Sequence, residues 1–283
     1  MSRFLLAVLL AVSSPLAFTQ AQKAPAPAYE PSVGQEGKDV VWVPTPQVVV
    51  DKMLDMAKVT KDDYVIDLGS GDGRTVITAA KRGARALGVE YNPNMVELSK
   101  RNAAKEGVSD RAQFVKADLF ETDFSKATVI TMFLLPDINL KLRPKILNLK
   151  PGTRVVSNTF TMGEWQPDET ATVEKGCDGS WCNALFWIVP AKVAGNWTVQ
   201  MPPAVSRAPA TLVLRQQLTR VTGSATIDGN DVPLEDVVLR GDKLTFKFAG
   251  RKGEFSGQVR GNAIEGLFES GGSKSAWSAA LKG

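Results

Sequence analysis

The sequence predicts an α/β protein in which a Rossmann-like domain is followed by a small all-β barrel or sandwich. Two observations lead to this prediction. Up to about Pro190, short apolar runs alternate with helical segments, which is typical of a parallel sheet covered by helices on both faces. After Pro190 the helical segments stop. Short runs of alternating polarity then follow one another, separated by Gly-Asp, Gly-Asn and Gly-Gly turns, as in small antiparallel barrels and sandwiches.

The first domain is predicted to begin with a helix after Thr45-Pro46, where Thr45 can cap the helix and Pro46 suits its first position. Two further helices are expected to end near Gly83 and Gly107, the second of them starting at Asn92-Pro93. The last helix, over 138–149, is expected to be kinked or split by Pro144. We expect seven strands: 64–68, 86–90, 112–117, 127–133, 153–159 and a hairpin of two strands that ends at Ile188.

The second domain is predicted to contain eight short strands, and we expect it to be a packing module without a ligand of its own. The alternative is a ligand-binding or inhibitor-like barrel, which its Gly-Asp-x-Leu and Gly-x-Val-x-Gly-Asn-x-Ile-x-Gly segments loosely resemble. The expected strands are 196–199, 211–215, 220–227, 238–239, 244–248, 255–259, 264–268 and 275–279.

The chain has 283 residues, which is enough for one large domain or two modest ones. We expect residues 1–21 to be a signal peptide, 22–41 a disordered lead-in, 42–192 the α/β domain and 193–283 the β domain. The net charge of +4 is too small to indicate a nucleic-acid partner. The sequence contains no histidine, which removes histidine-based catalysis and argues against a zinc or iron site, so no metal is expected.

The N-terminus has the pattern of a targeting segment. Arg3 precedes the apolar run 4–12, and the small residues Thr19 and Ala21 allow cleavage after Ala21. The run is too short to span a bilayer comfortably, so no stable membrane span is expected after cleavage. The pattern predicts export, to the periplasm or beyond the cell. The alternative is an uncleaved segment that tethers the protein.

Two cysteines support export. Cys177 and Cys182 flank a four-residue segment between β-prone runs, and a hairpin would bring them within bonding distance. In an oxidising compartment such a pair normally forms a disulfide. Two free thiols in a loop are the alternative.

The most informative segment is Val65–Arg74, a buried strand that runs into a glycine-rich turn and then a helix. Glu90 ends the next strand, where an acid can bind two ribose hydroxyls. A dinucleotide site would have glycine at Arg74, but here the third glycine comes one residue early. The acids Asp67 and Asp72 disfavour phosphate and favour a ligand with a cationic end, such as S-adenosyl-L-methionine.

Residues 42–167 resemble class I S-adenosylmethionine-dependent methyltransferases, and more narrowly the small family of mitochondrial and bacterial protein-lysine N-methyltransferases. Nothing after about residue 195 takes part in this resemblance. The resemblance implies a seven-stranded methyltransferase sheet ending in a hairpin, and N-methylation of a lysine on a protein acceptor. The matching segments are 65–74, 79–83, 88–93, 106–108, 118–119 and 163–168.

The expected cofactor contacts follow from this comparison. Gly69, Gly71 and Gly73 would let backbone amides approach the methionine carboxylate and the ribose. Other residues would each recognise one group of the cofactor: the ammonium by Asp67, both ribose hydroxyls by Glu90, the adenine amino group by Asp118 and a ring nitrogen by the amide of Leu119. Thr45 is a candidate for the carboxylate end, and helix capping is its alternative role.

The sequence defines the binding site of the methyl acceptor less well than the cofactor site. The fourth strand leads into Phe133 and Pro136 and lacks the Asp/Asn-Pro-Pro-Tyr/Phe motif of many methyltransferases that act on nucleic-acid bases. Phe133, Pro136 and Trp165 are candidates for an apolar lysine channel, with Asp137 as the catalytic residue that helps remove the lysine proton. Packing in the core and loops is the alternative for all four. Because S-adenosylmethionine is made in the cytosol, the alternative function is an exported, non-catalytic nucleoside-binding or interaction protein.

Overall fold

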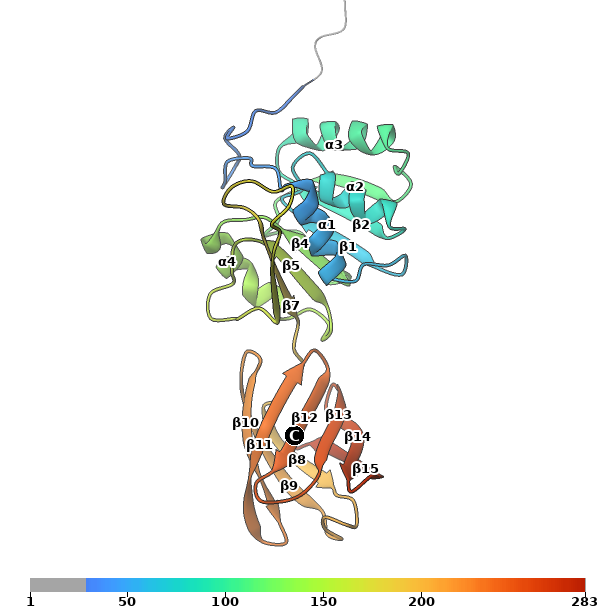
Figure 1. Cartoon of the computed structure of the whole chain (residues 1–283), viewed down its shortest axis with the longest axis vertical. Helices are drawn as coiled ribbons and strands as arrows, with labels where there is room; N and C mark the ends of the chain where they lie inside the picture. Colours follow the sequence, from blue (N-terminus) through green and yellow to red (C-terminus); the bar gives the residue numbers. More distant parts are fainter. Residues whose placement is uncertain (1–28, 283) are drawn as a thin grey trace, which may run out of the picture. The chain divides into compact units, whose positions relative to one another are not determined.

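The computed structural model of the chain describes residues 29–282, so the predicted signal peptide lies outside the described residues. The first domain contains a seven-stranded sheet with the order β3-β2-β1-β4-β5-β7-β6 (Figure 1). Its first five strands are parallel, β7 is antiparallel to β5, and β6 is antiparallel to β7. The predicted sheet with a terminal hairpin is therefore confirmed. The strands are β1 (Tyr64–Leu68), β2 (Arg85–Glu90), β3 (Ala112–Lys116), β4 (Val129–Met132), β5 (Arg154–Asn158), β6 (Glu169–Thr172) and β7 (Asn183–Ile188).

Helices cover both faces of this sheet because successive strand residues point to opposite sides. In β1, Val65 packs in one apolar cluster with residues of α1, α2 and α3, and its neighbour Ile66 packs in a second cluster with residues of α4. Figure 1 shows α4 on the other side of the sheet from the first three helices. The helices are α1 (Gln47–Met56), α2 (Arg74–Lys81), α3 (Pro93–Lys105) and α4 (Pro136–Ile146).

The predicted helix starts are only partly correct. The Asn92 side chain accepts a hydrogen bond of 2.9 Å from the amide of Asn94 and caps α3 as predicted. The cap predicted at Thr45 is wrong, because α1 starts at Gln47 with Pro46 as its N-cap and has no side-chain cap. Pro144 lies within the last turn of α4 without splitting the helix.

The segment before α1 folds back on itself, although a disordered lead-in was predicted up to residue 41. Gly34 donates to the carbonyl of Trp42 (2.8 Å), Trp42 donates to Gln35 (2.9 Å), and Gly37 donates to Val40 (3.0 Å). We call residues 34–42 the N-terminal hairpin. Val40 packs against the sheet's second apolar cluster, so apolar contact compensates for the poor intrinsic order of this composition.

The second domain is a closed barrel of eight antiparallel strands, which decides between the predicted barrel and sandwich. Fully buried aromatic side chains such as Trp197, Phe246 and Phe255 fill its interior, as expected of a small barrel. Its strands are β8 (Gly195–Gln200), β9 (Ala210–Gln217), β10 (Arg220–Ile227), β11 (Asn230–Arg240), β12 (Lys243–Phe248), β13 (Glu254–Arg260), β14 (Ala263–Ser270) and β15 (Ser273–Leu281). Within residues 29–282, no helix combines the length and the apolar character needed to cross a membrane.

Candidate functional site

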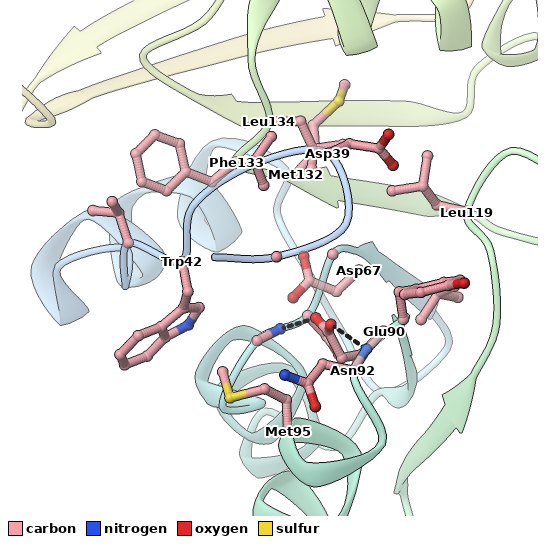
Figure 2. Close-up of a pocket in the computed structure, with 18 of the residues that line it drawn as sticks. Asp39, Trp42, Asp67, Glu90, Asn92, Met95, Leu119, Met132, Phe133 and Leu134 are labelled. Carbon is pink, nitrogen blue, oxygen red and sulfur yellow. Dashed lines mark hydrogen bonds between the residues drawn. The ribbon is translucent and has the colours of Figure 1, made fainter. Parts of the chain in front are cut away.

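A cavity of about 330 Å³ lies where β1, β2 and β4 end (Figure 2). Strand order reverses between β1 and β4, and ligands of open α/β sheets bind at such a switch point. The glycine-rich loop after β1 forms one wall, and the loops after β3 and β4 form others. The N-terminal hairpin and the residues up to Thr45 complete the wall.

The cavity brings together seven of the eight predicted cofactor residues: Thr45, Asp67, Gly69, Gly71, Glu90, Asp118 and Leu119. Gly73 does not line it. This glycine has a φ of 85°, and a Cβ there would lie 2.8–2.9 Å from Phe114 and Ser99. The structure thus gives Gly73 a packing function between the loop and the neighbouring strand and helix, and its contact with a cofactor stays a prediction.

Glu90 is held in place by two backbone amides. Its Oε2 accepts from the amide of Gly71 at 3.0 Å, and its Oε1 accepts from the amide of Asn92 at 2.9 Å (Figure 2). Each carboxylate oxygen has a second lone pair. The fixed carboxylate can therefore accept from two neighbouring hydroxyls, as a ribose presents them.

Asp67 is a buried acid in the middle of the cavity. Burial raises the pKa of its carboxyl to about 7, and the charges of Glu90 and Asp72 act in the same direction, against a 2.6 Å hydrogen bond from the Thr131 hydroxyl. The guanidinium of Arg74 forms a bidentate pair with Asp72 (2.6 and 3.0 Å), which compensates the charge of Asp72. A ligand ammonium would favour the ionised form of Asp67.

Asp118, which follows β3 in the sequence, lies in another wall of the cavity. Its Oδ1 accepts from the amide of Phe120 at 2.9 Å, and its Oδ2 pairs with Lys38 of the N-terminal hairpin. The hydrogen bond from Lys38 holds the pKa of Asp118 below its usual range. Sequence reasoning missed the hairpin, and the apolar run 40–43 after the Ala/Pro-rich stretch was the available signal.

Trp42 brings the hairpin onto the glycine-rich loop. A Cβ on Gly71 would lie 2.7 Å from the indole Nε1 of Trp42, and Gly71 has a φ of 54°. Glycine at this position therefore permits both the turn and the close approach of Trp42.

The acceptor side differs from the prediction. Phe133 lines the cavity, but Trp165 is fully buried against Trp187, with ring centroids 6.2 Å apart, so its assignment to a channel is wrong. Pro136 and Asp137 lie exposed at the start of α4 and do not line the cavity. The catalytic role of Asp137 stays a prediction without support from its position.

Two aromatic residues that sequence reasoning missed, Phe160 and Trp181, line the cavity beside Phe133. Trp181 lies in the loop between β6 and β7, which the predicted disulfide closes. Cys177 and Cys182 are bonded, with a Cα–Cα distance of 5.8 Å.

Known proteins resemble this chain mainly in its first domain. Residues 67–169 match the family described as the ANTKMT methyltransferase domain. A protein-lysine N-methyltransferase of Saccharolobus islandicus (strain REY15A) is 51% identical over 140 residues, which cover 48% of this chain and 87% of that protein. The adenine nucleotide translocase lysine N-methyltransferase of Mus musculus is 37% identical over 119 residues, 41% of this chain. The match spans only 51% of the mouse protein.

A solved structure also matches. The RNA methyltransferase from Salinibacter ruber, in complex with S-adenosyl-L-homocysteine, is 46% identical and superimposes with a TM-score of 0.50. The match covers 53% of this chain and 96% of that protein. The relatives thus agree on methyl transfer, while their names assign different acceptors.

Proposed function

Because the chain belongs to the class I S-adenosylmethionine-dependent protein-lysine N-methyltransferase family, we propose that it methylates the side-chain nitrogen of a lysine in an acceptor protein. One observation carries this proposal. A single cavity combines the fixed carboxylate of Glu90 and the buried Asp67 with an aromatic wall at Phe133. The first two suit a nucleoside with a cationic end, and the third suits an apolar chain that carries an amine.

The residues present fit S-adenosylmethionine, which supplies a methyl group already activated on a sulfonium. Glu90 offers acceptors for the ribose, Asp67 offers a negative charge for the ammonium, and the loop after β3 offers the Asp118 carboxylate and the Leu119 amide. The remaining tasks of the chain are to align the acceptor and exclude water, and neither needs histidine. Figure 2 shows Leu119 and Phe133 at opposite ends of the cavity. The nucleoside would therefore bind at one end and the acceptor lysine at the other.

The attacking amine has to be neutral. Besides Phe133, the cavity is lined by the buried apolar residues Met132, Leu134 and Ile138. Burial in such surroundings lowers the pKa of a lysine ammonium. We propose that the acceptor lysine loses its proton to water on entering this part of the cavity. If Asp137 were the base instead, Asp137→Asn would lower kcat and shift its pH profile.

A test of the function uses radiolabelled S-adenosylmethionine and an extract that supplies both proteins and RNA. We expect label in protease-sensitive material, with mass spectrometry locating methyl groups on lysine. Label in RNase-sensitive material alone would instead match the name of the Salinibacter relative and overturn the proposal. Cofactor binding without transfer to any acceptor would favour the non-catalytic alternative.

We also propose that the protein is exported and works in an oxidising compartment. The Cys177–Cys182 disulfide supports this, because such bonds persist mainly outside the reducing cytosol. Fractionation of the producing cells, with mass spectrometry of the mature N-terminus, tests the proposal. Protein found only in the cytosol with residue 1 retained would contradict it.

A further inference from the structure

Three aromatic rings from distant parts of the sequence meet in the cavity wall. Phe133 follows β4, Phe160 follows β5, and Trp181 lies in the disulfide loop before β7. The centroid distances are 5.9 Å between the two phenylalanines, 5.7 Å from Phe133 to Trp181 and 5.4 Å from Phe160 to Trp181. None of the three residues is fully buried, and Trp181 is 37% exposed. The rings therefore contact one another and line the cavity instead of lying wholly in the core.

Phe160 is held in place by a turn in which the backbone is strained. Thr159, directly before it, has a φ of 61°, a conformation that β-branched residues rarely adopt. The carbonyl oxygen of Phe160 accepts from Ser157 Oγ at 2.8 Å and from Asn139 Nδ2 at 3.2 Å, and these bonds keep the strained turn closed. Such strain persists where the surrounding structure enforces it, and it concentrates at functional sites.

Trp181 is held by the disulfide. Its neighbour Cys182 and the partner Cys177 are both buried and belong to the apolar cluster under α1. The bond thus anchors both ends of a short loop in the core while the indole between them stays at the cavity. Without the bond, this loop would have much greater conformational freedom.

We propose that Phe133, Phe160 and Trp181 form the binding site for the acceptor lysine, and that the Cys177–Cys182 disulfide is its positioning element. This inference rests on the proposed function. The lysine methylenes pack on the rings, and the Nζ lone pair forms the N–C bond as the methyl C–S bond breaks. S-adenosylhomocysteine and a methylammonium are the products. Positive charge passes from sulfur to nitrogen, where ring faces stabilise it.

The apolar residues around the three rings favour a lysine side chain over a nucleobase as the ligand of this site. Met132, Leu134 and Leu135, which flank Phe133 in the sequence, also line the cavity. They match the methylenes of a lysine, but they would leave the polar edges of a base without partners, and recognition of single-stranded bases relies on those edges as well as on stacking. The rings also suit the methylated products, whose charge is retained and whose apolar surface grows.

The test measures binding of a defined probe, so that it does not depend on turnover. The probe is Nα-acetyl-Nε-trimethyl-lysine amide, titrated by NMR into the full-length protein saturated with S-adenosylhomocysteine. Its neutral tert-butyl analogue serves as a comparison. We expect the cation to bind more tightly than the analogue. Trp181→Ala should weaken binding of the cation at least fivefold, while Trp181→Phe should restore most of it.

Two controls separate this site from general damage to the fold. Leu267→Ala, at an exposed apolar position on β14, should leave probe binding unchanged, and the affinity of Trp181→Ala for S-adenosylhomocysteine should stay within twofold of wild type.

Reduction of the disulfide should weaken probe binding in the wild type. The Cys177→Ser/Cys182→Ser double variant should bind weakly with or without reductant.

The outcomes distinguish this inference from the proposed function. If Trp181→Ala and reduction both leave probe binding unchanged, the inference is overturned even if lysine methylation is found. Occupation of the three-ring site by single-stranded RNA in place of the lysine probe, abolished in Trp181→Ala, would identify a nucleobase platform and also overturn it. If the probe binds as expected but no extract yields methylated protein, the proposed reaction would be contradicted and the proposed lysine-binding site would stand.

Discussion

The Nζ atom of Lys38 donates a hydrogen bond to the carboxylate of Asp118, which lies 80 residues further along the chain. The same ammonium lies 4.9 Å from the ring centroid of Tyr91. Lys38 belongs to the N-terminal hairpin, and Asp118 is the residue proposed to recognise adenine. Since residues 35–45 all line the cavity, this ion pair fastens the hairpin across the proposed cofactor site.

We therefore expect Lys38→Ala to speed both association and dissociation of S-adenosylmethionine several-fold, because the hairpin would open more often. The pair is partly exposed, so the effect should be modest, and raising the salt concentration should speed the wild type towards the variant. Stopped-flow fluorescence measures both rates. Lys100→Ala, which removes an exposed ion pair on α3, is the matched control. Unchanged rates in Lys38→Ala would show that the ion pair does not limit access.

The second prediction concerns Asp67 and cofactor affinity. Burial raises the pKa of this carboxyl to about 7 in the free protein, whereas a bound ammonium would keep it ionised. Affinity should therefore fall as the pH falls, by roughly five- to tenfold between pH 7.5 and pH 6. Calorimetric titration over this range avoids most of the titration of the ligand's own amino group. Asp67→Asn should bind weakly with little pH dependence, and a wild type that shows the same flat profile would contradict the assignment.

The same carboxyl should cost the free protein stability. Its pKa is about 7 in the folded state and 3.8 for an unperturbed aspartate, so the folded state binds more protons between these values, and stability falls as the pH rises through this window. Asp67→Asn removes this penalty. At about 1.4 kcal/mol per pKa unit, the variant should gain up to about 4 kcal/mol at pH 8 and almost nothing at pH 4. Chemical denaturation at both pH values measures the difference, and equal gains at both would point to another cause.

Sequence reasoning succeeded where a function depends on local structure. Asp67, the glycine-rich loop and Glu90 belong to one strand–loop–helix–strand unit, so their spacing alone predicts that they converge. The aromatic site depends instead on which side chains the folded loops turn inwards. Trp165 and Trp181 both occur in loops near the sheet's final hairpin. Trp165 is buried because it packs on Trp187, whereas Trp181 lines the cavity from the loop that the disulfide closes.

Long-range contacts explain the other differences. Residues 34–39 of the N-terminal hairpin are polar or glycine, a composition typical of disorder, and their order depends on contacts such as Lys38 with Asp118, 80 residues away in the sequence. Alternating polarity correctly predicted eight strands in the second domain. It did not decide between barrel and sandwich, because closure depends on β8 pairing with both β9 and β15.

The fourth prediction concerns the Glu90 carboxylate, which is proposed to bind the ribose. Glu90→Ala should weaken S-adenosylmethionine binding by about 1.5–3 kcal/mol, the range for hydrogen bonds to a charged group. It would also leave the amides of Gly71 and Asn92 without their acceptor. Glu90→Gln keeps one carbonyl oxygen and should lose less. Calorimetry measures both variants, and circular dichroism confirms that they are folded. Wild-type affinity in a folded Glu90→Ala variant would mean that the carboxylate does not bind the ribose.

The final prediction separates the two domains. Every residue that lines the cavity lies between 35 and 181, while β8 starts at Gly195 and the barrel has an apolar core of its own. A fragment of residues 22–194 should therefore bind S-adenosylmethionine within about threefold of the full chain, because it keeps all the hydrogen bonds described for Glu90, Asp67 and Asp118. Transfer to a protein acceptor is expected to weaken if the barrel helps to hold that acceptor. Calorimetry on the fragment, with its fold checked by circular dichroism, decides the matter. A soluble and folded fragment that had lost all cofactor affinity would show that the barrel is needed to form the site.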